Sequence, residues 1–337
     1  MTKLKRIGLI TENLNARLYI AQAQFAERMG FDSFWVPEDY AYPGAFSACG
    51  AIAATTTKIK IGTGVVNPFT RHPVVTAMEL AALDQISNGR AILGLGGGVK
   101  LWIEEQMGIP YGKPITALRD AVTIMRGLFA GEALDYQGKV ACARAGIRFN
   151  LEPQRADVPI ILGATGPKAL ELAGEIADGM MPVCASPEGI RKAVECVRIG
   201  AARAARSLAT FDFSAFLVTS IGTDERAARD ATKPLLATFL GWFANQPELS
   251  LFNDYGLSPA DVNEIRLIYR RGEIRPEFVS EGLIDGLTIS GNPARCREQL
   301  ARLIDSGLTS AIFFPANGLE FEQGVQLLRR ELLQGFI

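Results

Sequence analysis

Acidic residues follow two of the first apolar segments of the chain, where they could donate or accept a proton. Glu12 stands two residues after the apolar segment 6–10, and Glu38 and Asp39 follow the segment 33–36. Two adjacent carboxyl groups beside a bound ring could raise each other's pKa, so that one stays protonated and acts as an acid. A solvent-exposed pair of loop carboxylates would fit the same residues.

Glycine-rich segments follow three other apolar runs: GTGVVNP, GLGGG and GATGP. Glycine allows positive φ and close approach of the backbone, which a large flat ligand with a phosphate tail requires. In the third segment, Thr165 and Gly166 stand just before Pro167, a residue suited to the first position of a helix. Free N–H groups at that helix start, together with the Thr165 hydroxyl and Lys168, predict an anion site.

The only histidine of the chain, His72, lies in TGVVNPFTRHPVV. Histidine often transfers protons near neutral pH, but this one directly precedes Pro73 at the start of a predicted helix. We interpret His72 as structural and not as catalytic. The five cysteines are scattered and form no Cys-x-x-Cys pair, so we predict no metal site and expect reduced thiols in a cytoplasmic protein.

Composition narrows the class of protein. The chain has 337 residues, is 48% hydrophobic and carries a formal net charge of −1. No basic run interleaves with aromatic residues, so we expect no nucleic-acid partner. No apolar run is long enough to span a bilayer, and the first residues do not form a signal peptide. We therefore expect a cytoplasmic protein that acts on a small-molecule substrate.

Strands and helices alternate along the sequence in a way that would bring these residues together. Apolar runs predict eight strands, each followed by a helical pattern: 6–10, 33–36, 58–64, 90–96, 158–163, 179–183, 213–222 and 310–314. Most are continuously apolar, as a parallel sheet buried on both faces requires. Eight such units predict a (β/α)8 barrel, whose sites lie at the C-terminal ends of the strands. GLITEN follows the first strand in place of Gly-x-Gly-x-x-Gly, which argues against a Rossmann fold.

Two further segments bear on the architecture. Leu18, Ala21, Phe25 and Met29 recur at helical spacing, and Gly30 ends that helix. Residues 245–286 are too long for an ordinary loop, so we expect a helical insertion before the last strand that serves as a lid. A solvated excursion is the alternative. We treat residues 1–337 as one barrel domain.

Four segments together resemble the bacterial luciferase-like superfamily: TGVVNPFTRHPVVTA, LDQISNGRAILGLGGG, KPITALRDAVTIMRGLFAGE and PIILGATGPKALELAGEIADG. They are especially similar to the coenzyme F420-dependent branch that includes methylenetetrahydromethanopterin reductase. The resemblance extends from about residue 6 to residue 335. It implies a (β/α)8 barrel that binds a flavin or deazaflavin at the strand C-termini, commonly as a homodimer.

The resemblance also implies cofactor contacts. It puts a non-prolyl cis peptide at Gly64–Val65, where the backbone bulges against the back of the ring, and a hydrogen bond from Asn67 to the ring. The remaining implied contacts are Gly96 and Gly97 at the ring edge, and Thr165, Gly166, Lys168 and Ser186 at the phosphate.

The chain departs from the family at the acid. Many deazaflavin-dependent relatives carry Asp-His after the second strand, where this chain has Glu38 and Asp39. A glutamate expected in the first strand matches Ile10, and Glu12 lies two residues later. Asp39, Glu38 and Glu12 are therefore the candidate proton donors, and neither a pterin substrate nor a histidine mechanism carries over.

Three functions are compatible with these residues. The first is hydride transfer from reduced coenzyme F420 to a small organic substrate. The second is monooxygenation with reduced FMN and dioxygen on the same fold. The third is a non-catalytic barrel that binds a flavin-like ligand. In the first two, the cofactor carries the chemistry and the protein positions and polarises.

Overall fold

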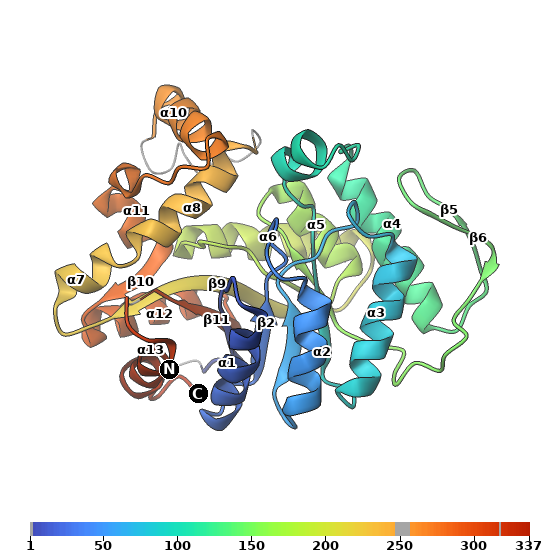
Figure 1. Cartoon of the computed structure of the whole chain (residues 1–337), viewed down its shortest axis with the longest axis horizontal. Coiled ribbons are helices and arrows are strands. Elements are labelled where there is room, and N and C mark those ends of the chain that lie inside the picture. The colour runs from blue at the N-terminus through green and yellow to red at the C-terminus, as the bar shows by residue number, and fades with distance from the viewer. Residues whose placement is uncertain (1–2, 247–256, 317) are drawn as a thin grey trace. The chain divides into compact units, whose positions relative to one another are not determined.

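The computed structural model describes residues 3–246, 257–316 and 318–337 (Figure 1). Its strand order is β10-β9-β11-β1-β2-β3-β4-β7-β8, and β9 also pairs with β8. The order therefore closes through eight strands, which confirms the predicted (β/α)8 barrel. These eight are β1 (Arg6–Ile10), β2 (Ser33–Val36), β3 (Lys60–Thr63), β4 (Ala91–Gly96), β7 (Ile160–Gly163), β8 (Gly179–Met180), β9 (Asp212–Ile221) and β11 (Ser310–Pro315).

Helices follow the strands, and local sequence explains where they begin. The helices are α1 (Ala16–Arg28), α2 (Ala45–Thr55), α3 (Pro73–Ile86), α4 (Pro114–Phe129), α5 (Pro167–Ile176), α6 (Pro187–Arg203), α12 (Pro293–Asp305) and α13 (Phe321–Leu327). Asn15 and Asn292 cap α1 and α12 by accepting a backbone N–H. Proline opens several of the others, because its missing N–H would have no partner at the first helical position.

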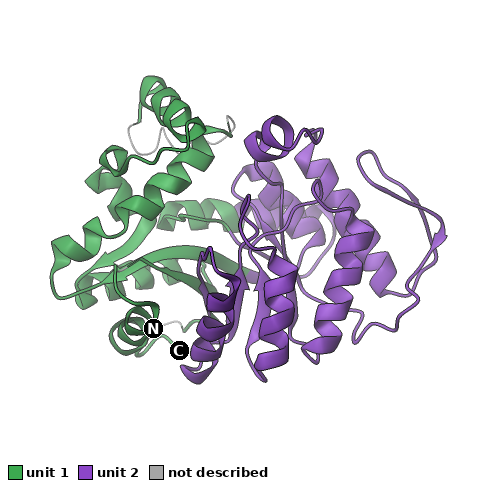
Figure 2. Cartoon of the chain, viewed as in Figure 1, with its two compact units in different colours: residues 1–7, 182–194, 213–337 green, residues 8–181, 195–212 purple. Residues whose placement is uncertain are grey.

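The chain divides into two compact units (Figure 2). One comprises residues 8–181 and 195–212, and is called the first-half unit below. The other comprises residues 1–7, 182–194 and 213–337, and is called the second-half unit. The apolar core of the second-half unit gathers around α8 (Lys233–Ala244), with Leu236, Phe239 and Ile284 almost fully buried. The expectation of a single domain stays a prediction.

The first-half unit is held together near the amino ends of its strands by a set of side-chain to backbone hydrogen bonds. The Glu27 carboxylate on α1 accepts the N–H groups of Thr57, Lys58 and Ile59. The Arg90 guanidinium, just before β4, donates to the carbonyls of Ala53, Thr56, Ile59 and Ser87 at 2.7–2.9 Å. We call Glu27, Arg90 and these backbone groups the amino-end network. It ties α1, α2, β3 and the α3–β4 turn to one another.

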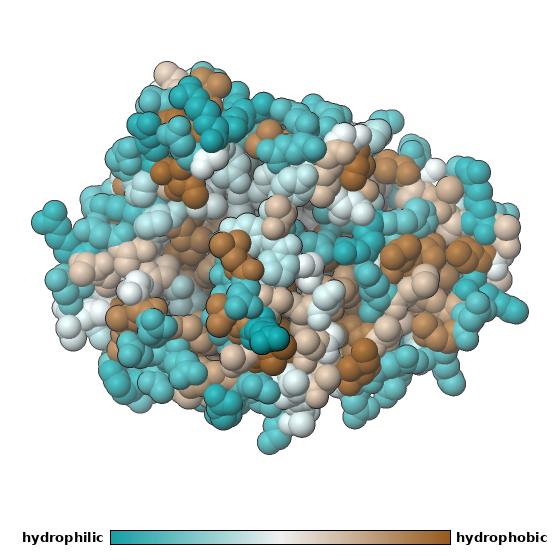
Figure 3. All heavy atoms as spheres, viewed as in Figure 1, coloured by the Kyte–Doolittle hydropathy of each residue, from teal (hydrophilic) through white to brown (hydrophobic). Residues whose placement is uncertain are grey.

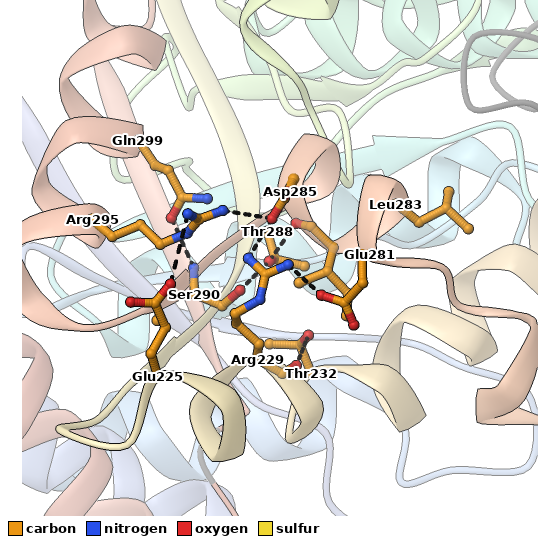
Figure 4. Close-up of polar contacts among 12 residues, drawn as sticks. Glu225, Arg229, Thr232, Glu281, Leu283, Asp285, Thr288, Ser290, Arg295 and Gln299 are labelled. Atoms are coloured by element: carbon orange, nitrogen blue, oxygen red, sulfur yellow. Dashed lines mark hydrogen bonds and ion pairs between the residues drawn. The ribbon is translucent and has the colours of Figure 1, made fainter.

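Ion pairs organise part of the second-half unit (Figure 4). Arg229 on α7 (Glu225–Asp230) pairs with Asp285 and Glu281 on α11 (Glu281–Leu287). Arg295 on α12 also pairs with Asp285, at 2.6 Å. These contacts fix the short strand β10 (Thr288–Gly291), which directly follows α11 and pairs in parallel with β9.

Three elements were not predicted from the sequence. β10 is only TISG, too short to show a period. The antiparallel hairpin of β5 (Leu134–Gln137) and β6 (Cys142–Ile147) lies in a stretch that reads as polar, because most of its side chains are exposed. η1 (Leu101–Gln106) is a π-helical turn after the GLGGG segment.

The predicted insertion is helical where the structure describes it. It contains α10 (Pro259–Arg270) and the 3-10 turn η2 (Pro276–Phe278), and it ends in α11. Residues 247–256 of the insertion lie outside the described residues. The last barrel strand follows only after β10 and α12, so the excursion is longer than predicted. Its role as a lid stays a prediction.

Helix α1 forms as predicted, and Gly30 follows it with φ +75°. Its buried residues, however, are Tyr19, Ala23, Phe25 and Ala26, while Leu18 is 46% exposed. Of the four residues whose spacing predicted the helix, Phe25 is buried. Among the described residues, no helix combines the length and apolarity needed to cross a bilayer.

Candidate active site

The register of three neighbouring strands brings the acidic and glycine-rich segments to one edge of the sheet. Ile10 at the end of β1 pairs with Trp35 of β2, and Val36 pairs with Thr63 of β3. The strands are parallel, so Glu12, Asp39 and Gly64 all emerge at the carboxyl edge, as predicted. All three belong to the first-half unit.

Asp39 and Glu12 form a hydrogen-bonded pair of carboxyl groups. Burial, the charge of Glu12, the hydrogen bond to Glu12 and the charge of Glu38 raise the pKa of Asp39 from its ordinary 3.8 to about 8. Burial also raises the pKa of Glu12, against the opposing effect of hydrogen bonds from Tyr42 and Asp39. The pair therefore shares one proton near neutral pH, and Asp39 is the member that holds its proton to higher pH.

A tight turn after β2 sets the Tyr42 hydroxyl against Glu12. The Tyr42 N–H donates to the Asp39 carbonyl at 3.2 Å, and Ala41 between them has φ +62°. A left-handed alanine is uncommon and costs free energy, and such residues cluster at functional sites. Burial and the Glu12 charge raise the pKa of Tyr42, so this hydroxyl stays protonated and remains a donor.

Helix α1 fixes the other side of Glu12 through the residues that flank it. The Asn13 N–H donates to the Tyr19 hydroxyl at 3.0 Å. The Asn13 and Thr11 side chains both donate to Gln22 Oε1, each at 2.7 Å. Burial first, and the nearby carboxylates Asp39 and Glu12 next, raise the pKa of Tyr19 to about 12. The loop that carries Glu12 is thus held on both sides.

Glu38 has a different partner from the one that its position beside Asp39 indicates. Arg71 binds the Glu38 carboxylate through both terminal nitrogens, at 2.8 and 3.0 Å. The charge of Glu38 still contributes to the raised pKa of Asp39, but only after burial and Glu12. The carboxyl pair that shares a proton is therefore Glu12–Asp39 and not Glu38–Asp39.

The Gly64–Val65 peptide bond is cis, at the position that the resemblance implies. Two glycines on neighbouring strands make room for the Val65 side chain. A Cβ added to Gly96 would lie 2.5 Å from Val65 Cγ2, and one added to Gly163 would lie 3.0 Å from Val65 Cγ1. Gly96 thus contacts the bulge itself, so its absence of a side chain is explained by packing as well as by the predicted ring contact.

Asn67 holds the loop after the cis bond. Its Oδ1 accepts the N–H groups of Phe69 and Thr70, each at 3.0 Å. The Nδ2 group of Asn67 donates to none of the residues that the structure describes. It can therefore donate to a bound ligand. Gly97 is partly exposed, and a Cβ there would meet only Pro114 at 3.3 Å. Both positions can therefore face a bound ring, and their contacts with it stay predictions.

The start of α5 carries the predicted anion-binding residues. Gly166 is the N-cap, no side chain caps the helix, and Pro167 is its first residue. Thr165 and Lys168 are exposed beside it. A Cβ added to Gly166 would meet nothing within 4 Å, so the space above this terminus is open.

Ser186 belongs to the second-half unit. Its Oγ accepts the Gly189 N–H at 3.0 Å in the first turn of α6. A phosphate-binding role for Ser186 stays a prediction.

His72 caps α3. Its Nδ1 accepts the Val74 N–H at 3.2 Å and its side chain is exposed. Because asparagine caps helices as well as any residue, His72→Asn is expected to leave the melting temperature nearly unchanged and turnover within a few-fold of wild type. Thermal unfolding and steady-state kinetics check this. A loss of roughly a thousandfold in the folded variant, the weight of a positioned acid or base, would make His72 catalytic.

The raised pKa of Asp39 has a consequence for stability. In the unfolded chain the carboxyl ionises near its ordinary 3.8, while in the folded protein it holds its proton to about pH 8. The folded state binds more protons between these values, so stability falls as pH rises through this window and levels off above it. Asp39→Asn removes this dependence.

The melting temperature of Asp39→Asn relative to wild type should therefore increase from pH 5 to pH 8, by roughly 2 °C or more, and stay constant above. Asp135→Asn, which changes an exposed carboxylate in the same unit, should show no such trend. A difference that is equal at pH 5 and pH 8 would contradict the raised pKa.

Sequence reasoning missed several residues of this site. Tyr42 lies in PEDYAYPG (37–44) and Arg71 in TRHP (70–73). Neither segment indicates which side chain these two residues would contact. Aromatic pairs also line the loops: Tyr40 stacks on Trp102 at 6.2 Å, and Phe69 packs on Tyr111 at 4.7 Å. No group of three or more possible metal ligands gathers within the described residues.

Comparisons with known proteins identify the family of the chain. A family profile described as luciferase-like monooxygenase matches residues 6–310. The chain is 32% identical to the 5,10-methylenetetrahydromethanopterin reductase of Methanolobus tindarius, over 92% of this chain and 94% of that protein. It is 33% identical to an F420-dependent glucose-6-phosphate dehydrogenase of Beutenbergia cavernae, over 66% of this chain and 69% of that protein.

A solved structure is similar over the whole length of the chain. The coenzyme F420-dependent tetrahydromethanopterin reductase of Methanopyrus kandleri superposes with a TM-score of 0.87 at 27% identity, covering 100% of both chains. The matches by sequence and by structure extend through the strands that carry the carboxyl pair, the cis peptide and the α5 terminus. The chain therefore belongs to the luciferase-like monooxygenase family, and within it resembles the coenzyme F420-dependent oxidoreductases.

Proposed function

We propose that this protein is a cytoplasmic oxidoreductase that uses coenzyme F420 for hydride transfer to or from a small organic substrate. The Glu12–Asp39 pair carries this proposal. One carboxyl group of the pair is protonated near neutral pH and lies at the carboxyl edge of the barrel. A hydride transfer to an unsaturated or carbonyl-like substrate requires a proton at the same site, and a group whose pKa is near the working pH supplies it best.

The residues at the carboxyl edge fit a deazaflavin. Bound there, the cofactor would supply the hydride. The wall formed by Val65 against Gly96 and Gly163 has no polar side chain, which suits the face of an aromatic ring. The Asn67 amide would hydrogen-bond the ring edge. Thr165, Gly166 and Lys168 would bind the phosphate at the uncapped start of α5, where backbone N–H groups and a cation attract an anion.

Asp39 would donate the proton, and Tyr42 would stabilise the Glu12 carboxylate beside it. Tyr42 donates a hydrogen bond to Glu12, which opposes the rise in the Glu12 pKa that burial causes. Glu12 would accept the Asp39 hydroxyl and hold it in one orientation. When the substrate accepts hydride, Asp39 would donate its proton to the atom that gains negative charge, and the hydrogen bond from Tyr42 would limit repulsion between the two carboxylates that remain.

A binding titration tests the cofactor assignment. Purified protein is titrated with coenzyme F420 and, separately, with FMN, and the reduced form of each is then offered with small carbonyl and alcohol substrates. We expect tighter binding of coenzyme F420 and oxidation of its reduced form only in the presence of a substrate. Productive oxygen consumption with reduced FMN would favour the monooxygenase alternative. Binding without turnover would leave the non-catalytic barrel.

We also propose that the protein is a homodimer that pairs through the outer faces of α2 and α3. These helices lie side by side in the first-half unit (Figure 1). On α3 the outer residues Val75, Met78 and Ile86 are 42%, 50% and 56% exposed. The two acidic residues of α3 are both paired: Glu79, whose side chain is 37% exposed, with Arg71, and the buried Asp84 with Arg155.

An uncharged apolar stripe of this kind is unusual on a solvent-exposed helix and marks an interaction surface. Figure 3 shows pale and brown atoms over the part of the molecule where Figure 1 draws these two helices. A face with a single outward stripe can pair with its own copy about a two-fold axis.

Met78→Glu is therefore expected to dissociate the dimer, because it would bury two charges against apolar partners. Sedimentation at several protein concentrations checks this. Val140→Glu changes another exposed apolar residue, 39% exposed beside the β5–β6 hairpin, and should leave the dimer intact. A wild-type protein that sediments as a monomer would overturn the proposal.

A further inference from the structure

One arginine controls the charge next to the proton-sharing pair. Arg71 lies in the loop before α3 and grips Glu38, the residue that precedes Asp39. The two terminal nitrogens of the guanidinium meet the two carboxylate oxygens at 2.8 and 3.0 Å. Both side chains are largely buried, with 22% of Arg71 and 16% of Glu38 exposed. This is the planar two-point geometry that arginine can form and lysine cannot.

Two further contacts hold the Arg71 guanidinium in place. Its Nε lies 2.9 Å from Glu79 on α3. Its central carbon lies 5.3 Å from the centre of the Phe46 ring on α2, a cation–π contact. Arg71 therefore joins the loop after β2 to two helices. Its positive charge is shared between two carboxylates, so the cluster of Arg71, Glu38 and Glu79 carries a net negative charge.

The charged and titratable groups around Asp39 form two shells. Glu12 after β1, Tyr19 on α1, and Glu38 and Tyr42 after β2 interact with Asp39 itself. Cys49 on α2, and Arg71 and Glu79 next to and on α3, interact with Glu38. Arg71 is the one cation in this set. Three carboxyl groups, from Glu12, Glu38 and Asp39, would otherwise gather with no positive charge beside them.

We propose that Arg71 is a positioning residue for proton transfer, which anchors the Glu38 side chain and thereby orients Asp39 toward Glu12 and sets how tightly Asp39 holds its proton. The catalytic meaning of this rests on the proposed function. The electrostatic part does not, because it concerns only the protonation of Asp39 in the free protein.

Two physical effects follow from the contact. Glu38 binds Arg71 while Asp39, the next residue, hydrogen-bonds to Glu12, so anchoring Glu38 to Arg71 also holds the backbone from which Asp39 reaches Glu12. The cation also offsets the Glu38 charge. If Arg71 is replaced by a neutral residue, the bare Glu38 carboxylate disfavours ionisation of Asp39 more strongly, and Asp39 should hold its proton to higher pH.

The experiment follows the protonated carboxyl group directly by infrared spectroscopy of the free protein as a function of pH. The C=O absorption of protonated Asp39 is assigned by its loss in Asp39→Asn. In Arg71→Met we expect the midpoint of this absorption to move up by about one pH unit, the effect of one nearby charge. In Arg71→Met/Glu38→Gln, which removes both charges, we expect the midpoint to return close to that of wild type.

A matched control changes the net charge without touching the site. Arg119→Met removes an arginine from α4 that pairs with Glu175, and it should leave the midpoint unchanged. An unmoved midpoint in folded Arg71→Met overturns the proposal. If Arg71→Met does not fold, Glu38→Gln decides the question with Arg71 in place. It should lower the midpoint by about one pH unit, and an unchanged midpoint overturns the proposal.

The infrared titrations of the Arg71 and Glu38 variants need neither cofactor nor substrate. Failure here would leave the assignment to coenzyme F420 untouched, and failure of that assignment would leave this titration valid. A purely structural role for Arg71 would lower the melting temperature without moving the midpoint, so the two roles are separated by the same spectra.

Discussion

Asp39→Asn is expected to reduce turnover by roughly a hundredfold or more, the usual weight of a positioned acid, while the affinity for cofactor stays within a few-fold of wild type. Asparagine keeps the shape of the side chain and can still hydrogen-bond to Glu12, but it has no proton to transfer. The measurement is single-turnover oxidation of bound reduced coenzyme F420 by a substrate found in the titration described above.

The pKa of Asp39 also predicts the direction in which wild-type turnover changes with pH. The protonated form of Asp39 is the acid, and its pKa is raised to about 8 by burial and by Glu12 and Glu38. Turnover in the reductive direction should therefore be sustained below pH 8 and fall as pH rises through it. Equal rates for wild type and Asp39→Asn would show that the proton comes from Glu12, Glu38 or water.

Gly166→Asp is expected to raise the dissociation constant of coenzyme F420 by about tenfold or more, because a charge-assisted contact is worth about 1.5–3 kcal/mol. Gly166 has ordinary extended backbone, φ −82° and ψ 153°, and its surroundings leave room for a side chain. Aspartate is also a good N-cap and its charge suits a helix start. The melting temperature should therefore stay equal or increase while affinity falls.

Gly166→Asn is the matched control. It has the size and capping ability of aspartate without the charge, so it should weaken binding less than Gly166→Asp does. Isothermal titration of both variants with coenzyme F420 separates repulsion of the phosphate from steric obstruction. Equal, undiminished affinity in both folded variants would show that the phosphate binds elsewhere.

The strands of the barrel were predictable because most are buried on both faces and are therefore largely apolar. The start of α5 and the loops after β1, β2 and β3 were predictable for a related reason. In a parallel barrel, acidic and glycine residues that follow the strands gather at one edge whatever their separation along the chain. A cis bond at Gly64–Val65 came from resemblance alone, since no local propensity indicates it.

The pairing of side chains within the site was not predictable. Glu38 and Asp39 are neighbours in sequence, but adjacent residues point apart, so each found its partner on another element. Asp39 meets Glu12 across the β1–β2 register, and Glu38 meets Arg71 from beyond β3. Tyr19 on α1 is fully buried while Leu18 beside it is 46% exposed, and the spacing of apolar residues did not indicate which of the two faces the core. Such contacts depend on strand register and helix rotation, which a single sequence leaves open.

The amino-end network and the carboxyl pair lie at opposite ends of the same strands. Glu27 and Arg90 bind backbone groups at the end of the barrel where the strands begin. These hydrogen bonds stabilise the fold and do not depend on which substrate binds. The loops after β1 and β2, at the other end, carry the carboxyl pair without contributing to that network. Loop residues can therefore be exchanged without loss of this network, whereas replacing Arg90 would remove hydrogen bonds to four backbone carbonyls whatever the substrate.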